Sequence, residues 1–232
     1  MEKTKTFENY TVIIPTLNEE KNIGDLINLI LKLYPKINII ISDDGSVDLT
    51  KKIVENLKKN IIFLDRKNKK IKGLAISVID AIKISKTKYI VVMDADFQHP
   101  PEKIIDILNN LNTYDLVIAI RKNIKEINLF RRLISNFANS IAKIKLIIKN
   151  KNFSKDPLSG FFGIKKEIIL NSIIKNNNKY ELKGYKILFD FLKSYNKKIK
   201  IKEIMFNFAK RKKNVSKLNK WHIFYFLRSF LK

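Results

Sequence analysis

The chain has 232 residues and no cysteine, so disulfide bonds and thiolate metal sites are excluded. Only two histidines are present, which argues against a histidine-based zinc site. No apolar run approaches the roughly 18 residues that a membrane-spanning helix needs, and residues 1–9 are too polar for a secretory signal. A hydrophobic content of 45% suffices for one substantial core. Because the sequence predicts neither a secretory signal nor a membrane span, we expect the catalytic part of the protein to lie in the cytoplasm.

The positive charge is concentrated in the second half of the chain. Residues 1–120 contain 18 Lys/Arg and 16 Asp/Glu, whereas residues 121–232 contain 29 and 6, so the net charges are +2 and +23. A general preference for lysine would raise the charge of both halves alike and does not explain the difference. The asymmetry predicts an anionic partner for the second half, either nucleic acid or a membrane surface.

Five short apolar runs in the first half predict β-strands, at residues 10–14, 37–41, 61–64, 89–93 and 114–120. Apolar residues at helical spacing predict helices between them, at residues 23–33, 48–59, 74–85 and 101–111. Strands that alternate with helices and are hydrophobic throughout favour a mostly parallel α/β sheet with helices on both faces. In such sheets ligands bind at the carboxyl ends of the strands.

The segment after the fourth predicted strand carries the most specific chemical signal. Asp94, Asp96 and Gln98 follow that strand at alternate positions, just before a proline-initiated helix. Two carboxylates and an amide oxygen at a strand end suit a Mg²⁺ or Mn²⁺ ion that also holds phosphates. The simpler interpretation, equally weighted on these residues alone, is a helix-capping aspartate beside an ordinary turn aspartate.

Acidic residues also follow the first two strands, at Glu19 and at Asp43 with Asp44. Asp44 could accept a hydrogen bond from a ribose or a base, or could cap the following helix. No G-x-G-x-x-G or Walker sequence follows any predicted strand. A phosphorylated ligand would therefore have to be neutralised by a metal ion and by arginines.

The second half predicts fewer and less regular elements. A long amphipathic helix is expected over 129–149, a second helix over 184–195 and a strand over 198–204. Residues 156–161 have turn chemistry, 210–217 form a basic loop, and 221–231 are strongly aromatic. This last segment is too short to span a bilayer.

These motifs together resemble glycosyltransferase family 2, and within it the dolichol-phosphate mannosyltransferase (polyprenyl-phosphate sugar synthase) group. The resemblance covers roughly residues 10–218 and rests on motifs in the family's order. They are Pro15-Thr-Leu-Asn-Glu19, Asp43-Asp-Gly-Ser-Val-Asp48, Asp94-Ala-Asp-Phe-Gln-His-Pro-Pro-Glu102, Arg121, Arg131, Asp156-Pro-Leu-Ser-Gly-Phe161, Gly184-Tyr-Lys186, Arg211 and Ser216-Lys-Leu218. Asp-Ala-Asp followed by Gln-His-Pro is specific to this group.

The resemblance implies a GT-A fold, with a Rossmann-like nucleotide-sugar half (1–120) continuous with a basic acceptor and membrane-facing half (121–232). It implies a metal held by Asp94, Asp96 and Gln98, with Asp96, Arg121 and Arg131 as the catalytic residues. The nucleotide-sugar site that it implies comprises Pro15, Leu17, Glu19, Ser42, Asp44, Asp94, Ala95, Asp96, Gln98, Arg121, Arg211 and Lys217.

The implied reaction is inverting transfer of a sugar, foremost mannose from GDP-mannose, to a dolichyl or polyprenyl phosphate. The product would be a lipid-linked sugar that serves glycosylation. A phosphate monoester carries about −1.5 to −2 charge at neutral pH and needs no general base, which fits the scarcity of histidine. Alternatives are a UDP-glucose-dependent enzyme with the same acceptor and a family 2 transferase that acts on a glycan hydroxyl. A nucleic-acid-binding protein is disfavoured because no recognised nucleic-acid-binding motif is present.

The acceptor's lipid tail predicts a peripheral membrane protein on the cytoplasmic face, with a membrane-protein partner as a further possibility. Lysines and arginines near an anionic surface contribute about 1 kcal/mol each. The residues expected to enter the interface are Trp221, Phe224, Tyr225, Phe226, Phe230 and Leu231, with Lys220, Arg228 and Lys232 at the headgroups. In the alternative, these aromatic residues pack on the protein's own core or on a partner chain.

Overall fold

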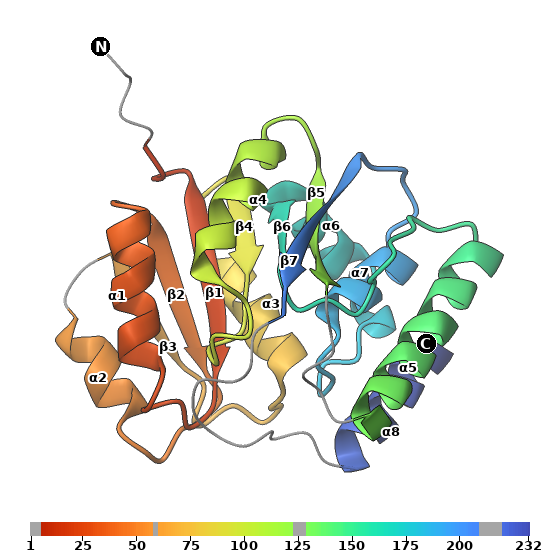
Figure 1. Cartoon of the computed structure of the whole chain (residues 1–232). Coiled ribbons are helices and arrows are strands. Elements are labelled where there is room, and N and C mark those ends of the chain that lie inside the picture. The colour runs from red at the N-terminus through yellow and green to blue at the C-terminus, as the bar shows by residue number, and fades with distance from the viewer. Residues whose placement is uncertain (1–5, 58–59, 123–128, 209–219) are drawn as a thin grey trace.

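The computed structural model describes residues 6–57, 60–122, 129–208 and 220–232, arranged around one seven-stranded sheet with the order β3-β2-β1-β4-β6-β5-β7 (Figure 1). The strands are β1 (Tyr10–Thr16), β2 (Asn38–Asp43), β3 (Ile61–Asp65), β4 (Tyr89–Val92), β5 (Leu116–Lys122), β6 (Phe162–Lys165) and β7 (Ile201–Asn207). All neighbouring strands are parallel except that β6 runs antiparallel to both β4 and β5. The expected mostly parallel sheet is therefore confirmed.

Helices cover both faces of this sheet, except that α5 and α8 pack on α7 instead (Figure 1). They are α1 (Ile23–Leu33), α2 (Thr50–Asn56), α3 (Leu74–Ile84), α4 (Ile104–Leu111), α5 (Leu129–Ile148), α6 (Lys166–Lys175), α7 (Ile187–Ser194) and α8 (Lys220–Leu231). Two buried clusters result: one includes α1 and α4, and the other includes α3, α6 and α7.

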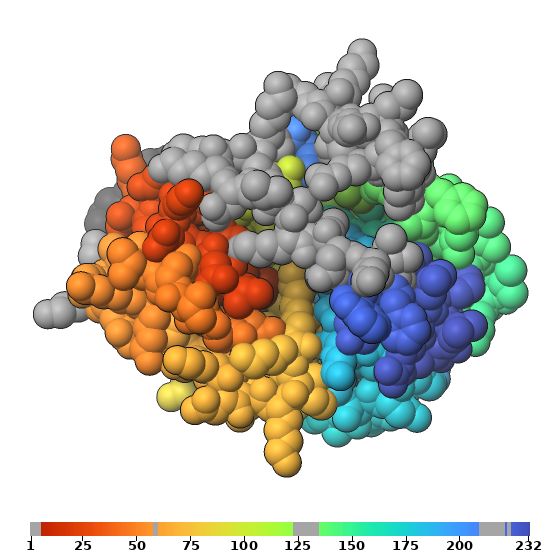
Figure 2. Space-filling view, turned by 90° about the horizontal axis from the view of Figure 1, so that it is seen from below, coloured from red at the N-terminus to blue at the C-terminus, as the bar shows by residue number. Residues whose placement is uncertain are grey.

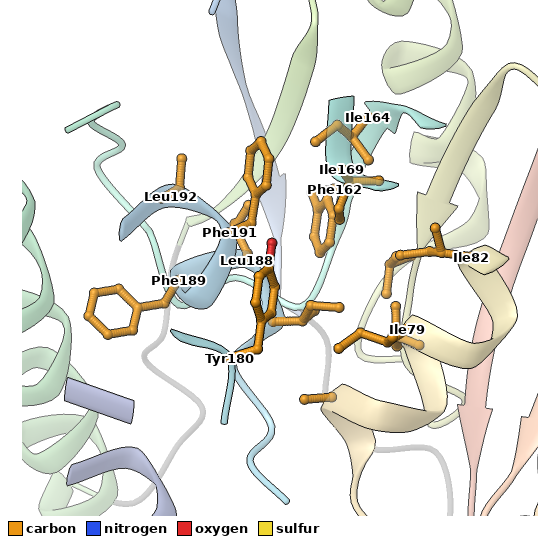
Figure 3. Packing of buried hydrophobic residues seen from close by; sticks show 14 of the residues in the cluster. Ile79, Ile82, Phe162, Ile164, Ile169, Tyr180, Leu188, Phe189, Phe191 and Leu192 are labelled. Carbon is orange, nitrogen blue, oxygen red and sulfur yellow. The ribbon is translucent and has the colours of Figure 1, made fainter. Parts of the chain in front are cut away.

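Alternate residues of each central strand point to opposite clusters. In β1, Val12 and Ile14 join the cluster of α1 and α4, whereas Ile13 joins the cluster of α3 and α7. Because side chains alternate across a strand, a sheet covered on both faces needs apolar residues at every position. This requirement explains the uninterrupted apolar runs that predict these strands. Figure 3 shows the second cluster, in which α3 faces β6, α6 and α7.

The structure differs from the sequence expectation at two places in the sheet. β6 and α6 fill residues 162–175, where no element is expected, and β6 enters the sheet between β4 and β5. β7 begins at Ile201 and ends at Asn207, three residues later than the expected strand at 198–204. Pairing with β5 over seven residues fixes these bounds. β5 spans the expected boundary at residue 120, so strands from both halves belong to one sheet.

The aromatic segment at the end of the chain forms α8, which packs beside α5 and α7. The Phe189 ring of α7 lies 6.2 Å from the ring of Phe226 and 6.5 Å from that of Phe230, and Phe226 is buried. Arg228 and Lys232, expected at lipid headgroups, both form ion pairs with Glu181. For Phe226 and Phe230, packing on the protein's own core holds instead, because one face of α8 covers α7.

The opposite face of α8 is exposed, and it carries Trp221, Phe224, Leu227 and Leu231. α5 lies beside α8 (Figures 1 and 2) and exposes Phe137, Ile144, Ile147 and Ile148. Among the described residues, no helix is long and apolar enough to cross a membrane.

Candidate active site

A cleft of about 350 Å³ opens at the carboxyl ends of the strands and lies between the two halves of the chain. Figure 2 looks onto this edge of the sheet, with the N-terminal half in red to yellow and the C-terminal half in green to blue. The two halves meet at the start of α3, where the Ala75 and Ile76 N–H groups donate to the carbonyls of Gly184 and Leu182. The predicted residues that line the cleft are Pro15, Leu17, Glu19, Asp44, Asp94, Ala95, Asp96, Gln98 and Arg121.

The acidic segment after β4 places both of its carboxylates at the cleft. The side chain of Asp94 is 39% exposed, whereas Asp96 is buried and its Oδ1 accepts a hydrogen bond from the Gln98 N–H at 3.1 Å. Phe97, between them, has a positive φ of 62°, which turns the chain tightly. The turn brings the two aspartates and Gln98 to the same wall of one cleft.

His99 holds this segment from behind. The Asp94 backbone N–H donates to His99 Nδ1 at 3.0 Å, so this nitrogen must be unprotonated. Burial lowers the pKa of His99 to about 3, which keeps the ring neutral. The ring stacks on Phe161 with centroids 5.1 Å apart. Sequence reasoning gave His99 no site role, although its place in the Gln-His-Pro motif was a usable signal.

The oxygen atoms of Asp94, Asp96 and Gln98 suit a divalent cation, but a bound ligand must supply the rest of its coordination shell. Two carboxylates and one amide oxygen are the ligand types that Mg²⁺ and Mn²⁺ prefer. Within the described residues there is no group of three or more His, Cys, Asp or Glu side chains that could hold a metal. Bound phosphates and water would supply the remaining oxygens, as is usual for Mg²⁺ sites that act on phosphorylated substrates.

The two neighbouring aspartates after β2 have different roles. Asp43 is buried and accepts hydrogen bonds from Thr16 Oγ1 at 2.9 Å and from the backbone N–H groups of Gly45 and Ser46. It therefore fixes the loop that follows β2. Asp44 lines the cleft. Sequence reasoning assigned only Asp44 to the site and gave Asp43 no role there.

Arg66 and Gly73 hold the Asp44 carboxylate at the cleft. Arg66 is 1% exposed and pairs with Asp44 Oδ1, and Asp44 Oδ2 accepts from the Gly73 N–H at 2.6 Å. Gly73 has a φ of +144°, and a Cβ there would lie 2.9 Å from the Lys183 backbone, so glycine is needed. Burial raises the pKa of Asp44, and the hydrogen bond from Gly73 and the charge of Arg66 oppose that rise.

A cationic wall faces the cleft from the second half. Arg121 forms a bidentate ion pair with Asp156, with Nε–Oδ2 and Nη2–Oδ1 distances of 2.8 and 3.0 Å. Lys186 also lines the cleft and donates to the Leu158 carbonyl at 2.8 Å. Burial and the charge of Arg121 lower the pKa of Lys186 to about 8. Lys186 belongs to a motif that the sequence displayed but to which sequence reasoning assigned no role.

Gly160 joins the two walls of the cleft. A Cβ at this position would lie 3.3 Å from His99 Cε1 and 3.5 Å from both carboxylate oxygens of Asp94. The 156–161 loop therefore approaches the acidic segment so closely that it leaves little room for a side chain. Arg121 and Asp156 belong to the same arrangement, because Ser159 Oγ of this loop donates to the Ala119 carbonyl of β5.

Four predicted site residues are not placed in the cleft by the described structure. Ser42 is fully buried behind it, with its hydroxyl donating to the Ser77 carbonyl at 2.8 Å. Arg131 belongs to α5, but its side chain lies outside the described part of the chain. Arg211 and Lys217 lie outside the described residues altogether. The roles of these last three residues stay predictions.

A mostly parallel sheet with acidic strand ends and a cationic opposite wall is an arrangement suited to a ligand that carries phosphate groups. The chain belongs to glycosyl transferase family 2, because the sequence model of that family matches residues 11–174.

Two curated relatives are similar over most of this chain. A dolichol-phosphate mannosyltransferase of Pyrococcus furiosus is 36% identical over 230 residues, which cover 94% of this chain and 61% of the relative. A dolichol-phosphate mannosyltransferase of Saccharomyces cerevisiae is 29% identical over 227 residues, which cover 90% of this chain and 81% of the relative. The chain thus spans less than two thirds of the length of the Pyrococcus protein.

Solved structures with the same fold include glucosyl-3-phosphoglycerate synthase of Mycobacterium tuberculosis in complex with phosphoglyceric acid. Its TM-score is 0.65 at 17% identity, with 96% of this chain and 80% of that chain covered. A complex of the same synthase with Mn²⁺, UDP and glucosyl-3-phosphoglycerate has a TM-score of 0.61 at 18% identity, covering 90% and 73%. The GT-A fold implied by the sequence is thereby confirmed.

Proposed function

We propose that this chain transfers mannose from GDP-mannose to a dolichyl or polyprenyl phosphate, with Mg²⁺ or Mn²⁺ as its cofactor. The observation that carries the proposal is the cleft itself, in which Asp94, Asp96 and Gln98 share a 350 Å³ space with Arg121 and Lys186. The names of the curated relatives support the choice of mannose and of the lipid phosphate. The family supports the reaction class, which is glycosyl transfer.

The first half of the chain, residues 1–120, would bind the donor. Asp94, Asp96 and Gln98 would hold the metal, which offsets the negative charge of the nucleoside diphosphate. Asp44 would receive a hydrogen bond from the ribose or the base, since Arg66 and Gly73 fix its carboxylate at the cleft.

Three predicted residues precede α1 at the donor end of the cleft: Pro15, Leu17 and Glu19. Pro15 belongs to β1, and the β1–α1 loop that holds Leu17 and Glu19 is braced against the segment after β2. The Glu19 backbone N–H donates to Thr50 Oγ1 at 2.8 Å, and the Asn18 N–H donates to Ser46 Oγ at 2.7 Å. Such bracing keeps the nucleoside site pre-formed.

The second half, residues 121–232, would receive the acceptor phosphate. An oxygen of that phosphate attacks the anomeric carbon of the sugar, a new C–O bond forms, and the bond to the diphosphate breaks with its electron pair leaving on the diphosphate. Attack opposite the leaving group inverts the anomeric configuration. Arg121 and Lys186 lie where they can orient the attacking phosphate, and the ion pair with Asp156 holds Arg121 in place. Arg131, Arg211 and Lys217 would add positive charge around both phosphates.

The lipid acceptor requires the cleft to meet a membrane, and α5 and α8 supply a surface for that contact. Together they expose eight large apolar side chains: Phe137, Ile144, Ile147, Ile148, Trp221, Phe224, Leu227 and Leu231. The half of the chain that contains these helices has a net charge of +23. Apolar residues surrounded by lysine and arginine are typical of proteins that bind peripherally to anionic membranes. We place the protein on the cytoplasmic face.

The activity is tested with a panel of labelled nucleotide sugars offered with polyprenyl phosphate and Mn²⁺, and the label is counted in the lipid phase. GDP-mannose should give the highest transfer, and EDTA should abolish it. Asp96→Ala should do the same without unfolding the chain, whereas Asp106→Ala, at an exposed carboxylate paired with Lys103, should leave transfer unchanged. Transfer that survives in EDTA or in Asp96→Ala would refute the metal site. A preference for UDP-glucose would show that the proposed sugar donor, GDP-mannose, is wrong.

Membrane association is tested with substitutions confined to the exposed face of α8, because truncation would also remove the buried Phe226. Trp221→Ser/Phe224→Ser should reduce sedimentation with anionic vesicles, and residual binding should weaken as salt rises. The matched control is Ile62→Ser/Ile84→Ser, which removes two exposed apolar residues elsewhere. Equal loss of binding in both variants, or no loss in either, would refute this surface as the anchor.

A further inference from the structure

A second cavity, of about 330 Å³, is lined by six lysines. They come from four separate parts of the C-terminal half: the end of α5 and the turn after it, the short 3-10 helix after α6 (Asn177–Lys179), the end of α7, and the end of α8. The six are Lys145, Lys149, Lys151, Lys179, Lys193 and Lys232. None of them lines the active-site cleft.

Only part of this positive charge is compensated by the described residues. Lys193 pairs with Asp190 at 2.8 Å, and Lys232 pairs with Glu181 at 3.1 Å. Lys151 donates to the side-chain amide oxygen of Asn196, which is neutral. Within the described part of the chain, no carboxylate forms an ion pair with the three other lysines, Lys145, Lys149 and Lys179.

Helix ends offset some of the remainder. α5, α7 and α8 all end at this cavity, and each helix carboxyl end carries about half a negative charge. With the two carboxylates, roughly three and a half negative charges therefore face six ammonium groups. The excess of more than two positive charges distinguishes this cavity from ordinary capping of helix ends by lysine.

The lysines are held close enough to repel one another. Lys145 is buried, with its Nζ 4.6 Å from the centre of the Phe230 ring. Its burial and the charges of Lys193 and Lys149 lower the pKa of Lys145 to about 8. The pKa of Lys151 is also lowered, by burial and by the charges of Lys179 and Lys149. An anion bound in the cavity would relieve this repulsion. Packing of the helices does not by itself require six lysines to meet at one place.

We propose that this lysine pocket is a second anion site, which binds a phosphate monoester or a diphosphate group. The charge of such a group, about −1.5 to −2 for a monoester, matches the excess in the pocket. Lys149 is exposed and Lys151 and Lys179 are half-buried, so these flexible side chains can turn toward it. The group belongs either to a free phosphate compound or to a lipid headgroup, since Ile148 and Leu231 beside the pocket are exposed and apolar.

The pocket lies at the opposite end of α7 from the active site. Lys186, immediately before α7, lines the cleft, and Lys193, in its last turn, lines the lysine pocket. Seven residues of helix separate them by about 10 Å along the axis. The inference does not rest on the proposed transferase activity, because binding at the pocket is measured without any sugar donor.

The test uses the full chain and measures the binding of inorganic diphosphate by calorimetry. Lys149→Gln/Lys179→Gln removes two lining charges near the surface, and Lys83→Gln/Lys175→Gln removes two exposed lysines that do not line the pocket. We expect the first variant to weaken binding by about tenfold or more and the control to change it little. Neither variant should unfold at a lower temperature than the wild type, because none of the four side chains is buried. The pocket variant should unfold at the same or a slightly higher temperature, because it also removes repulsion between lysines.

Two further measurements locate the ligand and identify its source. Lysine-labelled protein should show by NMR that diphosphate raises the pKa of Lys145, a shift that Lys149→Gln/Lys179→Gln diminishes. Vesicles that contain phosphatidic acid, with its monoester headgroup, are compared with phosphatidylglycerol vesicles of equal surface charge. If Lys149→Gln/Lys179→Gln loses a preference for phosphatidic acid, the ligand of the pocket is a lipid headgroup. If this variant loses only diphosphate binding, the ligand is a free phosphate compound. Equal diphosphate and vesicle binding in both variants, or an unchanged Lys145 pKa, would overturn the proposal.

Discussion

Replacement of Arg66 by methionine should destabilise the fold and disturb the donor end of the cleft. The guanidinium is buried and ion-pairs with Asp44 and with Asp80 Oδ2, the latter at 3.0 Å. It also donates to Ser77 Oγ and to the Ile71 carbonyl, both at 2.9 Å. Methionine fills a similar volume but leaves all four acceptors without this donor.

The size of the effect follows from the burial of the network. Loss of one partner from a buried ion pair costs about 3–5 kcal/mol, because the remaining charge is left uncompensated. Asp44 and Asp80 are 12% and 25% exposed, so water reaches them in part and the lower end of this range applies. In a domain of this size, each kcal/mol lowers the melting temperature by about 2–4 °C. We therefore expect a melting temperature lower by roughly 6–12 °C.

Thermal unfolding followed by circular dichroism measures the change in melting temperature, and urea unfolding measures the loss of free energy. Arg66→Met/Asp44→Asn should recover part of the loss, since it removes one of the two stranded charges. The control is Lys51→Met, whose ion pair with Asp65 is exposed and whose loss should leave the unfolding midpoint unchanged. If Arg66→Met unfolds at the same urea concentration as Lys51→Met, the buried network does not stabilise the fold as argued.

Three further outcomes are expected. Lys145→Met should raise the free energy of unfolding at pH 7 by about 1–3 kcal/mol, because the folded chain holds this lysine at a pKa of about 8 against 10.5 when unfolded. The gain should shrink as pH rises from 8 toward 10.5, and equal stability at pH 7 would contradict it. Gly163→Ala should cost about 1–3 kcal/mol in thermal unfolding, because a Cβ there would overlap Ile107 and lie 2.9 Å from Leu111 Cδ1. Arg131→Ala should raise the KM for polyprenyl phosphate about tenfold without changing GDP-mannose affinity, and an unchanged KM would return it to an ordinary surface residue.

The sequence by itself determined the class of fold and the location of the acidic wall. Continuous apolar runs such as residues 89–93 predict strands buried on both faces, and the structure confirms this two-sided burial for β1 and β4. Asp94, Asp96 and Gln98 could be placed at a strand end because they follow such a run directly. These features are local, so periodicity and spacing along the chain are enough to predict them.

Only the tertiary structure decided which distant residues meet. β6 enters the sheet antiparallel between β4 and β5, and its own four residues predict neither that direction nor that position. Lys186 reaches the cleft because the segment before α7 is bonded to the start of α3. The six lysines of the second cavity are spread over 88 residues, from Lys145 to Lys232, and in the sequence they are simply part of a basic half. Their convergence depends on how α5, α7 and α8 pack together, which is set by long-range burial of apolar surface rather than by any local pattern.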